Sequence, residues 1–360
     1  MRVIVSAGGT GGHIYPALAI INKLKERNKN VEILYIGTTD RMEKDLIPSL
    51  GICYNGIPMK GLNRKKIFKN IEVLKSFKNA IKEIKVIMKE FKPDIVLGIG
   101  GYITTPVILA AHSLGIKTFI HEQNSIPGLS NKILKRKANK IGVSLEDSLK
   151  YFKRCDVEFT GNPRSEEAYL AKPVQKKKYG LSEDKKLILF VMGSLGSYTV
   201  TEIMKDIIPK FKGKNYEVLF VTGKRFMENY EGVVIPDNVK MVPILDDMLN
   251  VLKKTDIIIT RAGASTIAEI TAIGVPAIMI PSPHVTHNHQ EKNAAVLEKN
   301  GSAIVIHEKD LTKDRLFDEI DKLINDEKKL NEMRENSRKM GVIDSATKIA
   351  IIIEKLVNGD

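Results

Sequence analysis

A short apolar run that leads directly into a cluster of glycines constrains the fold of this chain more than any other feature. Arg2 to Ser6 reads as a buried strand, and Ala7 to His13 follows it, before an amphipathic helix that we expect to start near Ile14. A strand, a glycine turn and a helix N-terminus form a site for anions or sugars, because backbone N–H groups converge there and missing Cβ atoms allow close approach. His13 ends the predicted turn and places an ionisable imidazole beside any ligand.

The spacing of these glycines excludes two common phosphate-binding motifs. In a dinucleotide fingerprint counted from Gly9 the third glycine would fall on Ile14, and no Lys-Ser or Lys-Thr pair follows Gly12, as a P-loop requires. A turn that only lets a helix pack closely on a sheet is the alternative. Four glycines with Thr10 and His13 exceed what packing needs, so we interpret the segment as a binding turn.

The composition is that of a soluble globular protein with room for two domains. The chain has 360 residues, of which 43% are hydrophobic and 28% charged, and this length exceeds the usual size of a single core. No signal-peptide pattern opens it, and no uncharged apolar run approaches the roughly 20 residues of a membrane span. Cys53 and Cys155 form no disulfide framework or metal motif, and we expect both to be buried thiols.

The net charge of +14 is concentrated in the first half of the chain. Residues 1–162 carry +13 and the remainder +1, and residues 60–92 alone hold 11 basic and 3 acidic side chains. Such a surface attracts polyanions or an anionic membrane. Few aromatic side chains, such as Phe68 and Phe77, are interspersed with these lysines, so we expect no nucleic acid partner.

The segment Met59 to Phe68 mixes cations with apolar side chains and precedes a predicted helix over 67–91. Apolar residues of that helix recur at helical spacing with lysines between them, which is typical of a packed helix with a solvated lysine face. The preceding segment lacks this periodicity. We interpret Met59 to Phe68 as a contact with a membrane surface.

Apolar strands alternate with helical patterns throughout the first half. Strands are predicted at residues 2–6, 31–36, 52–57, 95–99, 117–120, 140–143 and 157–160. This alternation is typical of an α/β fold in which helices cover both faces of a parallel sheet. Ligands of such sheets bind at the carboxyl ends of the strands, so the loops that follow strands are candidate sites.

Three further loops of the first half carry polar residues at that edge of the predicted sheet. They are Gly98 to Thr105, His121 to Asn124 and Thr160 to Arg164. A His-Glu pair such as His121-Glu122 is, by itself, more often a helix cap or a surface pair. Together with the glycine turn, however, the loops place four polar segments at one edge, which favours a binding site.

The same architecture repeats after a change of domain at Asn162-Pro163 and a charged connecting segment at 172–186. Strands are predicted at residues 187–192, 217–221, 240–242, 256–259, 277–280 and 303–306, and the first of them again ends in a glycine turn, 192–197. We expect domains at 1–162 and 163–340 that face each other across a cleft. A helix within 341–360 is expected to pack back on the first domain.

The loop richest in functional residue types in the second half is Thr260 to Glu269. Small residues free the backbone at a helix N-terminus, and Glu269 can accept two hydrogen bonds from a vicinal diol such as a ribose. An acid that stabilises the helix dipole is the alternative. A later loop contains His284, His287 and His289, but no carboxylate joins them at ligand spacing, so we expect no metal.

Several motifs of this chain occur together, and in the same order, in a known enzyme family. They are Gly8 to His13, Gly100-Gly101-Tyr102, His121 to Asn124, Gly161 to Arg164, Arg261 to Ala264 with Glu269, and His289-Gln290 with Asn293-Ala294. Over its whole length the chain resembles the GT-B glycosyltransferases of peptidoglycan synthesis, which consist of two Rossmann-like parallel-sheet domains that face a cleft. One position departs from the family, because Leu195 stands where its second glycine turn usually carries glutamine. Ser194 and the backbone are then the expected phosphate ligands of that turn.

The resemblance implies an inverting hexosyltransferase that uses no metal or other cofactor. It would move GlcNAc from UDP-GlcNAc to the 4-hydroxyl of the MurNAc unit of undecaprenyl-diphospho-MurNAc-pentapeptide (lipid I), giving lipid II by single displacement. It also implies a peripheral protein on the anionic cytoplasmic face of the cell membrane. Proteins of cell-wall synthesis and cell division would be further partners.

The resemblance also implies roles for individual residues. His13 is the candidate base on the acceptor hydroxyl, and a hydrogen bond to the acceptor or its diphosphate is its alternative role. Thr10, Gly11 and Gly12 would line the acceptor site. The other implied substrate contacts are Tyr102, Asn124, Arg164, Ser194 and Gln290, the Ile244 backbone at the uracil, Glu269 at the ribose, and Ala264, Ser265, Thr266, Ile267 and Ala268 at the diphosphate and sugar.

A different GT-B transferase or a UDP-sugar epimerase is the rival interpretation. Either would share the pattern of the second half but would leave the basic first half without a purpose. Activity with a lipid-linked acceptor separates these functions.

Overall fold

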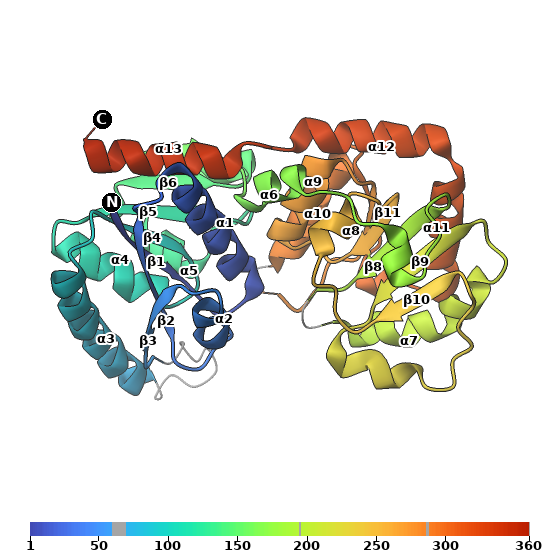
Figure 1. Cartoon of the computed structure of the whole chain (residues 1–360), viewed down its shortest axis with the longest axis horizontal. Coiled ribbons are helices and arrows are strands. Elements are labelled where there is room, and N and C mark those ends of the chain that lie inside the picture. Colours follow the sequence, from blue (N-terminus) through green and yellow to red (C-terminus); the bar gives the residue numbers. More distant parts are fainter. Residues whose placement is uncertain (60–69, 194–195, 286–287, 360) are drawn as a thin grey trace. The chain divides into compact units, whose positions relative to one another are not determined.

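The computed structural model describes residues 1–59, 70–193, 196–285 and 288–359. The chain divides into two compact units, a first unit of Met1–Arg164 with Asp344–Asp360 and a second unit of Ser165–Ile343. Each unit is built around a parallel sheet with helices packed against it (Figure 1). The predicted α/β class is confirmed.

Among the described residues, the sheet of the first unit has seven parallel strands in the order β3-β2-β1-β4-β5-β6-β7. The strands are β1 (Arg2–Ala7), β2 (Glu32–Thr38), β3 (Cys53–Ile57), β4 (Ile95–Gly100), β5 (Lys117–Glu122), β6 (Lys140–Val143) and β7 (Val157–Phe159). The chain builds outward from β1 to β3 and then returns to the other side of β1 with β4. The strand order therefore reverses between β1 and β4, which is where sheets of this kind bind ligands.

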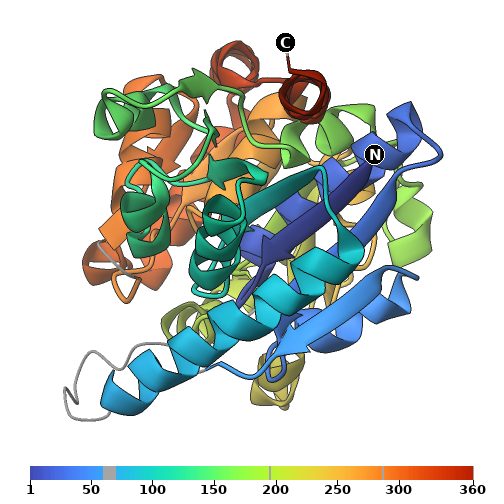
Figure 2. The ribbon, with the colours of Figure 1, turned by 90° about the vertical axis from the view of Figure 1, so that its left-hand side faces the viewer.

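Helices cover the two faces of this sheet. They are α1 (Gly11–Arg27), α2 (Glu43–Ser49), α3 (Asn70–Phe91), α4 (Thr104–Ser113), α5 (Leu129–Leu134) and α13 (Ser345–Asn358). Helix α6 (Arg164–Leu170) begins in this unit with Arg164 and continues in the second unit. Val5 of β1 packs in one apolar cluster with α1 and α13, whereas Ile4 packs in another with α3 and α4. Neighbouring residues thus face opposite layers, as the strand period of two requires. Figure 2 shows α3 lying across the sheet.

The C-terminal helix α13 packs on the first unit. Arg27 of α1 donates two hydrogen bonds to the carboxylate of Glu354, with N···O distances of 2.9 and 2.7 Å. Ile349 and Ile353 of α13 are fully buried in the cluster that includes α1. The last helix therefore completes the apolar layer on that face of the first sheet.

The second unit repeats the design with six described parallel strands in the order β10-β9-β8-β11-β12-β13. They are β8 (Lys186–Val191), β9 (Tyr216–Val221), β10 (Val239–Val242), β11 (Ile257–Thr260), β12 (Ala277–Met279) and β13 (Ala303–Val305). The strand order reverses between β8 and β11, so this unit has its own switch point. Each predicted strand of the chain is present, with ends displaced by at most two residues.

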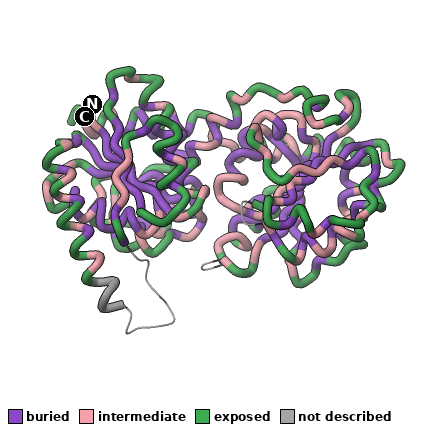
Figure 3. The backbone as a smooth tube through the Cα atoms, turned by 60° about the horizontal axis from the view of Figure 1, so that its bottom comes forward, coloured by how far each residue is buried: buried purple, intermediate pink, exposed green. Residues whose placement is uncertain are grey.

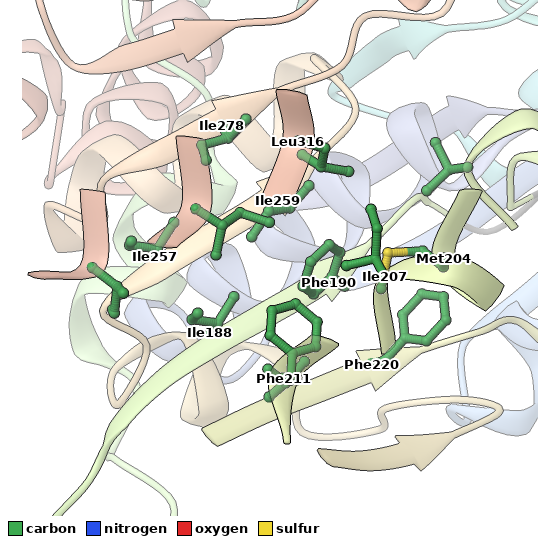
Figure 4. Close-up of a cluster of buried hydrophobic side chains, with 14 of the residues drawn as sticks. Ile188, Phe190, Met204, Ile207, Phe211, Phe220, Ile257, Ile259, Ile278 and Leu316 are labelled. Carbon is green, nitrogen blue, oxygen red and sulfur yellow. The ribbon is translucent and has the colours of Figure 1, made fainter. Parts of the chain in front are cut away.

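Two apolar layers enclose the second sheet. The helices are α7 (Tyr198–Ile207), α8 (Met248–Leu252), α9 (Ala264–Ile273), α10 (His289–Lys299), α11 (Lys313–Asn325) and α12 (Glu327–Met340), with most of α6. Phe190, Phe211 and Phe220 are at the centre of one layer, where they meet residues of α7 and α11 (Figure 4). In both units the central strands are buried and the exposed residues lie mainly on the surrounding helices, the loops and the edge strands (Figure 3).

Two local predictions are wrong. Helix α1 begins at Gly11 rather than near Ile14, so His13 lies in the first helical turn and does not end the glycine turn. Cys53 is exposed and Cys155 half-buried, because Cys53 lies on the edge strand β3 and its side chain faces solvent. Residues 60–69 of the predicted membrane contact lie outside the described residues. Along the described part of the chain, no helix combines the length and apolarity needed to cross a bilayer.

Candidate active site

The loops after β1 and β4 touch through their backbones at the switch point of the first unit. The Gly8 N–H donates to the Gly100 carbonyl oxygen at 3.2 Å. Gly101 has a φ of +89°, and a Cβ atom there would lie 2.4 Å from the Gly8 oxygen. Only glycine fits this close approach, so the contact fixes where the β1 loop lies.

His13 projects from the first turn of α1 against the β4 loop. A Cβ atom at Gly100 would lie 2.5 Å from its Cδ2, so the ring packs directly on that glycine. Its Nδ1 is 3.1 Å from the Gly8 carbonyl oxygen. A carbonyl oxygen only accepts, so we assign the hydrogen to Nδ1, and the neutral ring then has its lone pair on Nε2. His13 is held in the tautomer that takes up a proton at Nε2.

The glycine turn is a more limited anion site than the sequence indicates. The Gly8 N–H is bonded to Gly100, and the Gly9 N–H donates to Oε2 of Glu43 at 3.2 Å. The N–H groups of Gly11 and Gly12 precede the first intrahelical bonds, which His13 and Ile14 make to the Thr10 oxygen. Backbone contact with a ligand is therefore confined to the start of α1.

Glu43 is a buried carboxylate beneath this turn, and sequence reasoning did not single it out. It is 0% exposed, and its Oε1 accepts hydrogen bonds from Thr38 Oγ1 at 2.8 Å and from the Thr38 N–H at 3.3 Å. An acid in the first turn of a helix ordinarily indicates a favourable dipole interaction at the surface. The contact with Gly9 spans 34 positions of the chain, and no local pattern reports it.

His121 ties the loop after β5 to the loop after β7. The ring is fully buried, its Nε2 donates to the Gly161 oxygen at 3.0 Å, and its Nδ1 accepts from the Gln123 amide at 3.2 Å. Burial lowers the pKa of His121 to about 4. The imidazole is neutral near pH 7 and acts as a structural link between the two loops.

Glu122 organises the segment that follows it. Its carboxylate is 2% exposed and accepts from the N–H groups of Asn124 (3.0 Å) and Gly128 (2.9 Å) and from the Asn131 amide (2.8 Å). The His121-Glu122 pair is thus buried and hydrogen-bonded within the first unit, and it is not a surface pair. It holds half-buried Asn124 at the carboxyl edge of the sheet, where the sequence predicts a substrate contact.

Arg164 and Tyr102 lie at the same edge. The Arg164 guanidinium is 5.6 Å from the ring centre of Tyr15, and the backbone N–H of Arg164 donates to Oδ1 of Asn162 at 3.1 Å. A hydrogen bond with Tyr102, together with nearby negative charge, raises the pKa of Arg41. The structure therefore gathers the predicted residues of the first unit at the carboxyl ends of β1, β4, β5 and β7.

In the second unit, α9 starts directly after the β11 loop and offers backbone donors. The Ile267 N–H makes the first intrahelical bond, to the Gly263 oxygen at 2.9 Å, so the N–H groups of Ala264, Ser265 and Thr266 precede it. Ile267 and Ala268 follow these three N–H groups, and their contacts with the diphosphate and sugar stay predictions. Glu269, 7% exposed, follows in the second turn.

Arg261 anchors Ser197, the last residue of the second glycine turn. Its Nη1 donates to Glu308 at 2.7 Å and to the Ile280 oxygen at 2.9 Å, and its Nη2 donates to Ser197 Oγ at 2.6 Å. Burial acts to raise the pKa of Glu308, but hydrogen bonds from Thr199 and Arg261 outweigh it and lower that pKa. The motif that contains Arg261 was recognised in the sequence, but its positioning role was not.

The remaining predicted donor residues occupy separate loops of the second unit. Gln290 accepts from the Ser282 N–H at 2.9 Å, and Ile244 follows β10 and is 45% exposed. Ser194, Leu195 and His287 lie outside the described residues. Within the described ranges, no three His, Cys, Asp or Glu side chains group as metal ligands.

Family models and curated relatives match nearly the whole chain. The model of the glycosyltransferase family 28 N-terminal domain matches residues 3–143, and that of the C-terminal domain matches residues 187–349. A relative from Bacillus pumilus is 42% identical, and the alignment covers 99% of both chains. It is named UDP-N-acetylglucosamine--N-acetylmuramyl-(pentapeptide) pyrophosphoryl-undecaprenol N-acetylglucosamine transferase.

Solved structures show the same fold. The crystal structure of MurG from Acinetobacter baumannii is 26% identical, with a TM-score of 0.79 over 98% of this chain and 99% of that chain. A UDP-N-acetylglucosamine 2-epimerase is 15% identical, with a TM-score of 0.70 over 100% and 96% of the two chains. This second likeness concerns the fold alone.

Proposed function

The chain belongs to glycosyltransferase family 28, and we propose that it transfers GlcNAc from UDP-GlcNAc to lipid I, forming lipid II. The relative from Bacillus pumilus, with 42% identity over almost the full length, supports this activity over that of an epimerase. The 4-hydroxyl of MurNAc is the proposed acceptor group, and UDP is the leaving group.

His13 is the proposed general base. The observation that carries this role is the hydrogen bond from Nδ1 to the Gly8 oxygen, which assigns the Nε2 lone pair to proton uptake. As the new C–O bond forms, the acceptor O–H bond breaks and its proton moves to Nε2, while the C–O bond to UDP breaks with its electrons. A single displacement of this kind inverts the anomeric carbon. Thr10, Gly11 and Gly12 would hold the acceptor beside His13.

The donor is proposed to bind the second unit. The N–H groups of Ala264, Ser265 and Thr266 at the start of α9, with the helix dipole, suit the diphosphate and its developing charge. Glu269 would accept the ribose hydroxyls and the Ile244 backbone would contact the uracil. Gln290, Ser194, Asn124, Arg164 and Tyr102 are proposed as further substrate contacts.

A peripheral position on the cytoplasmic face of the cell membrane is part of this proposal. The acceptor has a lipid tail, and residues 1–162 carry a net charge of +13, which attracts an anionic leaflet. Met59 to Phe68 is the proposed contact segment. Proteins of cell-wall synthesis and cell division are proposed as further partners.

UDP release from UDP-GlcNAc tests this function, measured with and without a short-chain lipid I analogue in excess EDTA. We expect turnover that depends on the acceptor and persists in EDTA. His13→Ala should lower kcat at least a hundredfold and keep UDP-GlcNAc affinity, whereas His112→Ala, an exposed histidine of α4 in the same unit, should change neither.

Each alternative outcome removes one part of the proposal. Turnover without acceptor, or none with it, would exclude the lipid I transferase and favour the epimerase. Nearly full activity of His13→Ala would keep the enzyme and exclude His13 as the base. Loss of turnover in EDTA would contradict a reaction without metal.

A further inference from the structure

A single peptide group joins His13 to the buried carboxylate of Glu43. The Gly8 carbonyl oxygen accepts from Nδ1 of His13 at 3.1 Å, and the N–H of the same peptide, contributed by Gly9, donates to Oε2 of Glu43 at 3.2 Å. The oxygen and hydrogen of a trans peptide point in opposite directions, so the ring and the carboxylate lie on opposite sides of it. Neither side chain needs to touch the other for their charges to interact.

The hydrogen bonds around Glu43 suit a carboxylate at this position. It is 0% exposed, and its three partners there, the Gly9 N–H, the Thr38 N–H and Thr38 Oγ1, all donate or are able to donate. A buried charge is costly unless it is fully hydrogen-bonded, and this one is supplied with donors on both oxygens. A negative charge is therefore fixed beneath the turn on which His13 rests.

We propose that Glu43 is a positioning residue that acts on His13 through the Gly8–Gly9 peptide, a proposal that rests on His13 being the base. By accepting the Gly9 N–H, the carboxylate polarises the peptide and makes the Gly8 oxygen a stronger acceptor for Nδ1–H. This holds the tautomer with the Nε2 lone pair and stabilises the imidazolium that forms when Nε2 takes the acceptor proton. The Nδ1 proton stays on His13, and no proton moves to the peptide or to Glu43.

Glycines leave room for the Glu43 side chain next to the Gly8–Gly9 peptide. A Cβ atom at Gly8 would lie 2.7 Å from Oε1 of Glu43, and one at Gly37 would lie 2.8 Å from its Cγ. Gly9 has a φ of +91°, in the left-handed region that favours glycine, and its N–H donates to the carboxylate. The two glycines let the carboxylate approach the turn, and the conformation of Gly9 supplies the donor.

Other ionisable groups surround the pair, and none has its ordinary titration range near neutrality. They are Tyr35 of β2, Tyr54 of β3, Asp40 and Arg41 before α2, Asp45 of α2, Tyr102 after β4, Tyr15 of α1 and Arg164 of α6. Burial, followed by the charge of Glu43, raises the pKa of Tyr35 and of Tyr54, which keeps both phenols neutral. A change in rate between pH 5 and 8 that depends on Glu43 is therefore expected to report His13.

Glu43→Gln tests the action of Glu43 on His13 through the Gly8–Gly9 peptide, because glutamine keeps the shape of the side chain and removes its charge. We expect kcat to fall about tenfold. The acidic limb of the plot of kcat/KM against pH should shift to lower pH by about 0.5 to 1 unit, because a less stabilised imidazolium forms only at lower pH. Thr38→Val is the matched control. Valine removes one hydrogen-bond donor to Glu43, and Glu43 keeps its charge. The free energy of unfolding should therefore fall, and the acidic limb should stay at the same pH.

A double-mutant cycle separates this role from a structural one. If Glu43 acts through His13, Glu43→Gln should have no further effect on kcat in a His13→Ala background. An equal fall in both backgrounds, or an acidic limb that does not move, would overturn the proposal. Melting temperature and UDP-GlcNAc affinity show whether the variants are folded.

Nitrogen NMR of the wild-type histidine gives a test that needs no Glu43 variant. Neutral His13 should carry its hydrogen on Nδ1, and finding it on Nε2 would overturn the proposal even if Glu43→Gln fails to fold. Failure of the proposed function would look different, because wild-type turnover would then be missing or His13→Ala would remain active.

Discussion

Replacing Gly101 by alanine should destabilise the first unit and slow the reaction together. The new Cβ atom would lie 2.4 Å from the Gly8 oxygen, whereas ordinary contacts begin at 3.4 Å, so the two loops must separate by about 1 Å. An L-residue at a φ of +89° adds strain of about 1–2 kcal/mol. Loss of the bond from Gly8 N–H to Gly100 adds about 0.5–1.5 kcal/mol.

The sum is about 1.5–3.5 kcal/mol for Gly101→Ala, which corresponds to a fall of about 3–14 °C in the melting temperature of a unit of this size. Gly115→Ala is the matched control in the same unit. Gly115 also has a positive φ, +71°, but nothing lies within 4 Å of the added atom. Strain alone then predicts a fall of about 2–8 °C, which is smaller than for Gly101→Ala by the contribution of the lost hydrogen bond.

Calorimetry and steady-state kinetics check both parts of this prediction. Because the Gly8 oxygen positions His13, Gly101→Ala should also lower kcat by more than about tenfold, while Gly115→Ala should leave kcat unchanged. UDP-GlcNAc affinity, assigned to the second unit, should survive both changes. Equal melting temperatures for the two variants would refute the claim that close backbone approach, rather than backbone conformation, requires glycine at 101.

Two further predictions concern buried charged or ionisable groups. The stability of the first unit should fall as pH drops from 6.5 to about 4, by at most about 1.4 kcal/mol per pH unit, because the unfolded chain binds a proton that native His121 does not. The free energy of unfolding, measured by chemical denaturation at several pH values in this range, should show this pH dependence. His121→Asn should remove the dependence and lower the free energy of unfolding at pH 8. Arg261→Ala should cost about 3 kcal/mol, since it leaves the Glu308 side chain, which is only 12% exposed, without its cation, and should raise KM for UDP-GlcNAc through Ser197 at the end of the 192–197 turn. Arg334→Ala, which breaks the more exposed pair with Asp256, should cost about 1 kcal/mol or less and leave KM unchanged.

The sheets could be predicted because their signal is local. Buried parallel strands are short apolar runs bounded by polar or glycine-rich loops, and each run is visible in consecutive residues of the sequence. The sequence predicts the start of α1 too late, because glycine is a poor helix former and Gly11 and Gly12 are typical of a turn. In the structure the N-cap is Thr10, and the first turn of the helix carries the glycines and His13.

The internal support of the site could not be predicted, because it depends on contacts between distant residues. Glu43 is hydrogen-bonded to Gly9, which lies 34 positions away in the sequence, and Arg261 is hydrogen-bonded to Glu308, 47 positions away. The pattern of the His121-Glu122 pair was recognised, but sequence alone left open whether it binds a ligand. In the structure, His121 bonds the Gly161 oxygen and Glu122 accepts from the Asn131 amide, so the pair connects neighbouring loops of the first unit.

The two switch points occupy equivalent places in their sheets but offer different chemistry. After β1, the Gly8 and Gly9 N–H groups are already bonded and a carboxylate lies beneath the turn, which disfavours an anion there and favours a proton on His13. After β11, the first N–H groups of α9 precede any intrahelical bond and present the positive end of the helix dipole. We therefore expect free UDP to protect amides at the start of α9 from hydrogen exchange and to leave the Gly8–Gly9 turn unaffected. Protection of that turn by UDP would contradict the assignment of the proton acceptor to the first unit and the diphosphate to the second.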